Sequence, residues 1–129
     1  MSWDPNAAAT VSAHAGTLEA LAIGGVDGHL HGTSDRSSWS PSQAELQGIV
    51  TTLTRMEAEA QLVVQGERFV MISREHRQVV GKSGAKAIVA VATDKIVLIA
   101  RVDESGGKKT SQALAVLGQL ASHYASSGY

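Results

Sequence analysis

The sequence predicts an α+β domain in which helices pack against an antiparallel sheet of about seven strands. Helical patterns stand at both ends of the chain and once in between. The other segments are short apolar or β-branched runs, joined by turns that are too short for the crossovers of parallel strands. Aromatic residues make up only 4% of the 129 residues, so Val, Ile, Leu and Ala must form the core. A chain of this length forms one domain, residues 1–129.

The first part of the chain is predicted to form a helix and a hairpin. Residues 4–15 are expected to be helical, with Asp4 as the N-cap. The apolar segment 18–26 ends at Asp27-Gly28, a dipeptide typical of tight hairpin turns. Residues 29–33 are therefore expected to return as the second strand.

A polar loop over residues 33–40 is expected to lead into a second helix. Ser40 is the expected N-cap, and Gln43 is expected to reach back to it as in a capping box. Apolar residues then recur at the three- and four-residue spacing of one helical face. These residues are Leu46, Ile49, Val50 and Leu53.

The second half of the chain is predicted to contain five strands and a closing helix. Gly-containing turns or short polar breaks separate consecutive apolar segments. The strands are expected over residues 61–64, 68–73, 78–81, 87–92 and 96–102. After a loop over 103–107, the closing helix is expected over 110–126, because Leu and Ala residues there recur at helical spacing.

The composition excludes several classes of protein. The chain has no cysteine, which excludes a disulfide framework, a thiol nucleophile and thiolate metal ligands, and fits a reducing compartment. The first residues show no basic stretch followed by an apolar run, so no secretory signal is expected. No apolar run approaches about 18 residues, so no membrane-spanning segment is expected.

Charge is distributed unevenly along the chain, although the net charge is only −1. Residues 1–65 contain two basic and seven acidic residues, a balance of −5. Residues 66–129 contain nine basic and five acidic residues, a balance of +4. Such an asymmetry indicates either an interaction face for an acidic partner or a set of simply solvated charges.

The local motifs do not support catalysis or a cofactor. Gly81-Lys82-Ser83 resembles the end of a phosphate-binding P-loop, but His76 stands where the first glycine is required and a strand is expected to follow. His29 and His31 have the spacing of two metal ligands on one strand face, yet no third ligand lies nearby in sequence. No Gly-x-Ser-x-Gly motif is present, and no carboxylate pair stands in an apolar setting. We therefore expect a protein that is not an enzyme.

Nucleic acid is not an expected partner, because the basic half of the chain lacks interleaved aromatic residues. The aromatic residues stand instead near the two ends of the chain. If the terminal helices pack side by side, Trp3, His123 and Tyr129 would meet on the surface. Exposed aromatic grooves of this kind bind polyproline II segments, which is one interpretation of these residues. The alternative is that Trp3 only fixes one end of the chain to the core.

Over its whole length the chain resembles the profilin family of actin-monomer-binding proteins. The order of elements is that of the family, and several segments are similar to its motifs. These segments are Met1-Ser2-Trp3, Gly24-Gly25-Val26-Asp27-Gly28, the stretch from Arg77 to Gly84, the strand from Ile96 to Glu104, and the end from Leu120 to Tyr129. The two ends are most similar to apicomplexan-type protist profilins, although the large insertions of that branch are missing.

The resemblance implies a fold and a function. The fold is a seven-stranded antiparallel sheet with the two terminal helices on one face and shorter helices on the other. The function is stoichiometric binding of monomeric actin, which regulates filament assembly without a cofactor. The matching actin-binding positions are Arg68, Arg74, Lys82, Lys86, Lys109 and Gln119, with Arg77 as an addition to the same face. All of them belong to the basic half of the chain, which suits an acidic partner.

The resemblance also implies a site for proline-rich segments between the terminal helices, at Trp3, His31, His123 and Tyr129. Two departures from the family pattern weaken this site. Pro5 and Asn6 stand where the family has an aromatic residue early in the first helix, and His31 replaces a usual Trp. Binding is therefore expected to be weak or altered. Phosphoinositide head groups are a further partner that the basic residues would suit.

The resemblance further implies a monomer in the cytoplasm that is associated with the cytoskeleton. The alternative is a roadblock- or longin-like scaffolding module of a GTPase system, which shares a small sheet-and-helix plan. The oligomeric state separates the two, because a roadblock module is a dimer.

Overall fold

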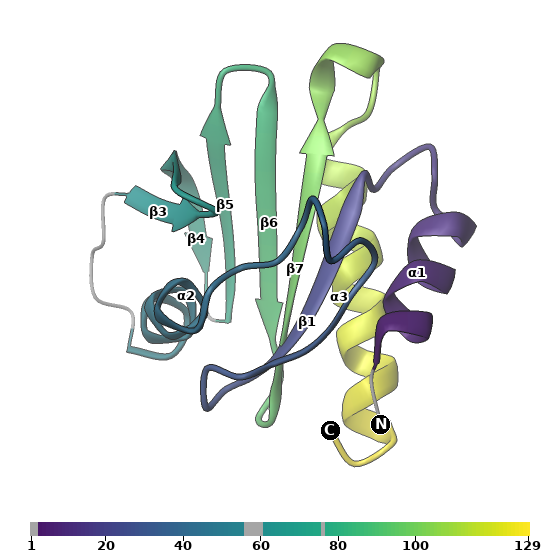
Figure 1. Cartoon of the computed structure of the whole chain (residues 1–129), viewed down its shortest axis with the longest axis vertical. Coiled ribbons are helices and arrows are strands. Elements are labelled where there is room, and N and C mark those ends of the chain that lie inside the picture. The colour runs from purple at the N-terminus through teal and green to yellow at the C-terminus, as the bar shows by residue number, and fades with distance from the viewer. Residues whose placement is uncertain (1–2, 56–60, 76) are drawn as a thin grey trace.

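The computed structural model describes residues 3–55, 61–75 and 77–129 (Figure 1). The α-helices are α1 (Asp4–Ala13), α2 (Gln43–Arg55) and α3 (Thr110–Ser126), and a 3-10 helix, η1, covers Glu104–Gly106. The strands are β1 (Ala20–Gly25), β2 (Leu30–Thr33), β3 (Gln61–Val64), β4 (Glu67–Glu75), β5 (Gln78–Ser83), β6 (Lys86–Ala92) and β7 (Ile96–Asp103). In the part of the chain that is described, no helix has both the length and the apolarity to cross a membrane.

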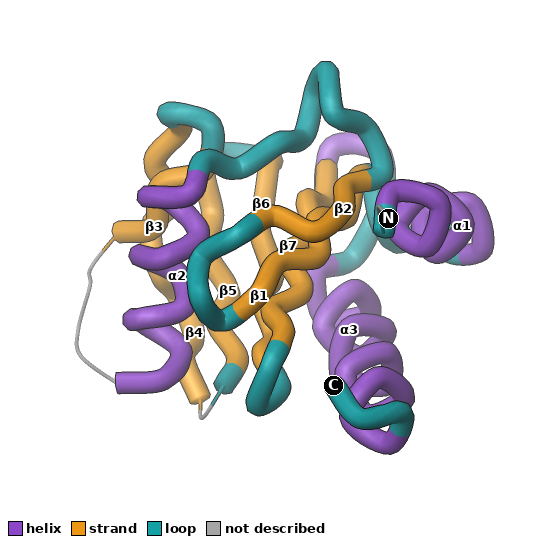
Figure 2. The backbone as a smooth tube through the Cα atoms, turned by 60° about the horizontal axis from the view of Figure 1, so that its bottom comes forward, coloured by secondary structure: helices purple, strands orange, loops and turns teal. Residues whose placement is uncertain are grey.

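The seven strands form one sheet in the order β2-β1-β7-β6-β5-β4-β3, and every neighbouring pair is antiparallel. Helices α1 and α3 lie next to each other on one face, and α2 covers the other face (Figures 1 and 2). The predicted fold class is therefore confirmed. The hairpin expected around Asp27-Gly28 joins β1 and β2, and Gly28 has the positive φ of +92° that such a tight turn favours.

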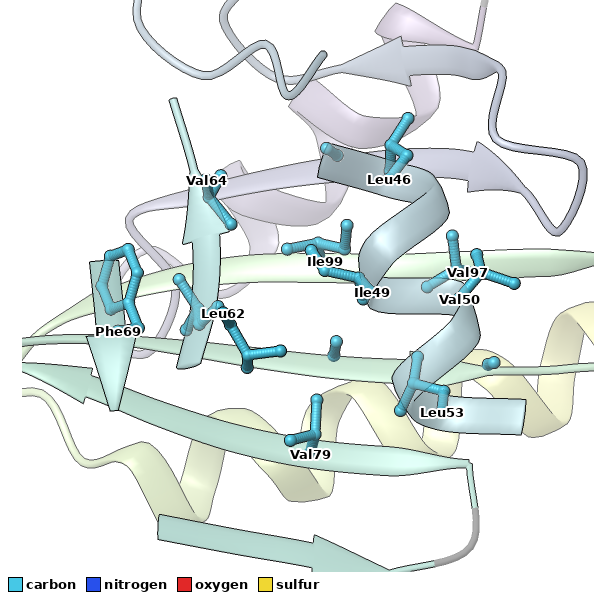
Figure 3. Close-up of a cluster of buried hydrophobic side chains, with 14 of the residues drawn as sticks. Leu46, Ile49, Val50, Leu53, Leu62, Val64, Phe69, Val79, Val97 and Ile99 are labelled. Carbon is cyan, nitrogen blue, oxygen red and sulfur yellow. The ribbon is translucent and has the colours of Figure 1, made fainter. Parts of the chain in front are cut away.

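A separate hydrophobic core lies on each face of the sheet. Strand β7 contributes to both because its side chains alternate between the faces. Val97 and Ile99 pack with α2, whereas Leu98 and Ala100 pack with α1 and α3. Figure 3 shows the apolar stripe of α2 against the first of these cores. The stripe consists of the predicted residues Leu46, Ile49, Val50 and Leu53, all of which are buried.

Helix α2 begins two residues later than the predicted cap implied. The prediction that Ser40 caps the helix and Gln43 closes the box is wrong. Ser42 accepts a hydrogen bond from the backbone N–H of Glu45 at 3.2 Å, and the Glu45 carboxylate accepts one from Ser42 N–H at 3.0 Å. Glu45 also accepts from the N–H of Gly66 at 2.9 Å, so the same carboxylate holds the helix to the β3–β4 turn. The Ser42–Glu45 capping box prevails because its carboxylate makes both contacts.

Helix α1 begins at the expected residue but is not capped by it. Asp4 is the first helical residue, and Trp3 precedes it in the N-cap position without a side-chain capping bond among the described residues. The Asp4 carboxylate bonds instead to β2 and to the loop that follows β2. The helix ends at Ala13, two residues earlier than predicted.

The loop between β2 and α2 is not wholly polar, because Trp39 is only 2% exposed. Its indole N–H donates to the carbonyl of Ile99 at 3.3 Å, and the Arg101 guanidinium lies over the ring at 5.1 Å from the centroid. Arg101 also pairs with Glu19 at 3.1 Å. This loop is therefore anchored in the core on the α2 face.

Candidate binding surfaces

One surface of the sheet stays open where β4 and β5 extend beyond α3. Val70 and Ile72 of β4 are 56% and 55% exposed, so two large apolar side chains lie close together at the surface. Val70 lies directly opposite Lys82 of β5, and Arg68 lies opposite Val63 of β3. Directly opposed residues share a face of the sheet. We call the surface formed by Arg68, Val70, Ile72 and Lys82 the β4 face.

The β4 face lies on the same side of the sheet as α3. Lys82 is opposite Ala87 of β6, and Ala87 belongs to the core beneath α3. The β4 face thus combines two exposed apolar side chains with two cations. The sequence analysis had identified the cations but not the apolar residues, although alternation with the buried Phe69 could have placed Val70 on the outer face.

The structure does not bring all the predicted basic residues together. Arg74 is opposite Val79, which packs in the core on the α2 face. Lys86 is opposite Ser83 and Asp103 and reaches Glu67 at 4.0 Å. Both cations therefore lie on the α2 side of the sheet, away from the β4 face.

Arg77 lies at the turn between β4 and β5, in a left-handed conformation with φ of +62°. Its guanidinium pairs with Asp94 of the β6–β7 turn at 2.5 Å. The remaining two predicted residues belong to the α3 region and are exposed. Lys109 directly precedes the helix, and Gln119 is roughly half a turn away from the buried Leu117. Among residues 3–55, 61–75 and 77–129, no carboxylate lies within 4.0 Å of Lys109 or Arg68.

Lys82 is held by a small network that connects the sheet to the start of α3. Its ammonium lies 3.0 Å from one oxygen of Glu104, and the other Glu104 oxygen accepts from the hydroxyl of Thr110 at 2.9 Å. The bonds from Lys82 and then from Thr110 hold the pKa of Glu104 below its ordinary value. Glu104 thus fixes the Lys82 side chain next to the first turn of α3.

Replacing Glu104 with Gln is expected to make the stability less dependent on pH. The lowered pKa means that the folded carboxylate stabilises the protein above the ordinary value of 4.5 and that this contribution is lost as the pH falls through the lowered pKa. In urea denaturation the variant should be less stable at pH 7, and the difference should shrink below pH 4.5. A difference that stayed constant down to about pH 3 would contradict this assignment.

A second surface is an aromatic cluster at the ends of the terminal helices. The indole of Trp3 lies 4.9 Å from the ring of Tyr129, 5.5 Å from Tyr124 and 6.0 Å from His31, between ring centroids. The ring centroid of His123 lies 5.8 Å from that of Tyr124, so His123 belongs to the same cluster. The structure therefore brings Trp3, His31, His123 and Tyr129 together, as the sequence analysis expected. The structure adds Tyr124 of α3 to this cluster.

The aromatic cluster is partly open to solvent. Tyr129 is 43% exposed, and its carbonyl accepts a hydrogen bond from the Thr93 hydroxyl at 2.7 Å. A cleft of about 400 Å³ adjoins Tyr129 and is also lined by Lys95 and Ser122. In the described residues, no group of three or more His, Asp or Glu side chains could hold a metal ion. His29 pairs with Asp27 at 3.2 Å instead.

Comparisons with known proteins give one family. The profilin family model matches residues 1–129. Acanthamoeba castellanii profilin II superposes with a TM-score of 0.86 at 25% identity, covering 99% of this chain and 100% of that one. Schizosaccharomyces pombe profilin gives 0.85 at 21% identity with the same coverage, and LokiProfilin2 in a complex with rabbit actin gives 0.73 at 17%, covering 89% of each chain. No curated protein sequence matches. The chain belongs to the profilin family.

Proposed function

We propose that the chain binds monomeric actin and thereby regulates filament assembly. Family membership and the β4 face support this proposal. The β4 face offers exposed Val70 and Ile72 beside Arg68 and Lys82, and such a combination of apolar centre and charged rim is typical of protein interfaces. Lys109 and Gln119 would extend the contact along α3. For Arg74, Arg77 and Lys86 we propose only a peripheral part, because each of them lies outside the β4 face.

The proposed mechanism is stoichiometric binding and not catalysis, in keeping with the family. A bound actin monomer would be kept from spontaneous nucleation, and the protein would act as a monomer in the cytoplasm and at the cytoskeleton. The cations of the β4 face would supply attraction toward an acidic partner. Phosphoinositide head groups are proposed as a further ligand of the same cations.

Calorimetric titration of monomeric actin tests the proposal. We expect saturable one-to-one binding, and Arg68→Glu should weaken it by about tenfold because a contacting cation becomes an anion. Lys95→Glu is the matched control, since Lys95 is an exposed cation of the β6–β7 turn, outside the β4 face. Absence of binding to the wild-type chain, or equal effects of the two variants, would contradict the proposal.

A second proposed function is docking of proline-rich segments on the aromatic cluster. The close approach of the Trp3, Tyr124 and Tyr129 rings supports it, because flat aromatic surfaces suit the polyproline II helix. His31 offers a smaller ring than the usual Trp, so the affinity should be low. Calorimetric titration with a decaproline peptide measures the binding, and Trp3→Ala should abolish it.

A further inference from the structure

The first turn of α1 lies unusually close to the edge strand β2. The backbone N–H of Trp3 donates to the carbonyl of His31 at 3.1 Å. A Cβ atom on Gly32 would lie 2.3 Å from the Trp3 carbonyl carbon, so only glycine allows this approach without a shift of the chain. The backbone on which the Trp3 indole is mounted therefore rests directly on β2.

The Asp4 carboxylate fastens this contact from the other side. One of its oxygens accepts the backbone N–H of Thr33 at 2.9 Å and an Arg36 N–H, from Nη2, also at 2.9 Å. The other oxygen accepts from Nε of Arg36 at 2.6 Å. Such a bidentate guanidinium–carboxylate pair is directional as well as attractive. Arg36 belongs to the loop after β2, which the sequence analysis regarded only as a polar connection.

The other described contacts of α1 are mainly apolar, because Trp3, Ala7 and Val11 pack against the core on this face of the sheet. The N-cap residue Trp3 has no side-chain capping bond within the described part of the chain, and Ala7 is the buried residue of the helix. A short helix with so little buried surface depends on tertiary contacts for its position. The Asp4–Arg36 pair adds a charged contact to this packing, and Asp4 directly follows Trp3 in sequence.

We propose that Asp4 and Arg36 are positioning residues of the aromatic cluster. Together they clamp the first turn of α1 onto β2 and hold the Trp3 indole between His31 and the rings of Tyr124 and Tyr129. The inference rests on the proposed docking of proline-rich segments. In that docking, the Asp4–Arg36 clamp would set the distances between Trp3 and the neighbouring rings. It assigns no contact with the ligand to either residue.

The variant Arg36→Gln tests the proposal in the full chain. We expect its affinity for decaproline to fall about three- to tenfold, the size of effect that a half-exposed bidentate pair produces. Acrylamide should quench Trp3 more strongly, and Trp39 does not interfere because it is only 2% exposed. Affinity for monomeric actin should change less than about twofold. Lys108→Gln, which removes the same charge next to the other end of α3, is the control and should leave decaproline affinity and quenching unchanged.

Asp4→Asn separates the two halves of the clamp, because the amide oxygen still accepts from Thr33 while the charge for Arg36 is lost. Its decaproline affinity should match that of Arg36→Gln and not fall further. Unchanged quenching and affinity in both variants would overturn the proposal, as would a parallel loss of actin and decaproline binding, which indicates general destabilisation. If the wild-type chain does not bind decaproline, the proposed docking is wrong, and the quenching data alone still decide whether the clamp positions Trp3.

Discussion

Replacing Val70 with Asp is expected to weaken binding of monomeric actin at least 30-fold, about 2 kcal/mol. Val70 is 56% exposed and lies opposite Lys82, in the middle of the β4 face. A partner docked there would cover the side chain, and replacing a covered apolar group with a carboxylate loses the apolar contact and costs desolvation, even with Lys82 opposite. The free protein should fold normally, because the substituted side chain faces solvent. Calorimetric titration of actin measures the affinity.

Val70→Thr is the matched variant for this experiment. It keeps the shape of the side chain and replaces one methyl group with a hydroxyl, so its loss of affinity should be several-fold and not 30-fold. Thermal unfolding of both variants checks that the sheet is intact. Actin binding of the Asp variant at wild-type strength would contradict the β4 face as the interface, even if the chain binds actin elsewhere.

Replacing Trp39 with Ala is expected to lower the free energy of unfolding by about 3–5 kcal/mol. The indole is among the largest fully buried side chains, and its removal leaves a cavity on the α2 face of the sheet. The change also removes the hydrogen bond to the Ile99 carbonyl and the ring beneath the Arg101 guanidinium. Urea denaturation measures the loss, provided that the free energy of unfolding depends on urea concentration with the same slope in both proteins.

Two further variants define the contribution of Trp39. Trp39→Phe keeps an aromatic ring but not the N–H donor, so it should cost less than the Ala variant. Trp3→Ala removes a tryptophan from the partly exposed aromatic cluster and should change stability by much less than Trp39→Ala. A loss below about 1 kcal/mol for Trp39→Ala would show that this side chain does not anchor its loop.

Much of the fold could be predicted because its patterns are local. The last helix was predicted over 110–126, and the structure has Thr110–Ser126. Its apolar stripe is long enough to be unambiguous. The strands were also found, although β4 and β5 extend further than predicted, to Glu75 and Ser83. Polar residues at these strand ends face solvent, so hydropathy does not mark where pairing stops.

The errors arose where a contact depends on distant parts of the chain. Trp39 is surrounded by polar residues in sequence, and only the approach of Ile99 and Arg101 explains its burial. Ser40 and Ser42 are equivalent N-caps by local pattern. Glu45 decides between them, because its carboxylate also reaches Gly66.

The basic surface was predicted only in part because of one bulge. Arg68 and Arg74 are an even number of residues apart, so a regular strand would place both on one face. The register of β4 shifts between Met71 and Ser73, and the extra residue reverses the alternation. Arg74 consequently shares a face with Val79, opposite to that of Arg68. No pattern in the single sequence marks this shift.

The strand order also determines which of the two surfaces, the β4 face or the aromatic cluster, can form first during folding. Strands β3 to β6 pair only with their neighbours along the chain, whereas β7 also pairs with the distant strand β1, where Ala20 lies opposite Arg101. Closing a long loop costs more entropy than pairing adjacent strands, so the β1–β7 pairing forms more slowly. During synthesis, β1 also cannot pair until β7 has been made. The β4 face therefore belongs to an early-forming meander. The aromatic cluster needs both α1 and the end of α3, so it is completed last, and a nascent chain would acquire the first surface before the second.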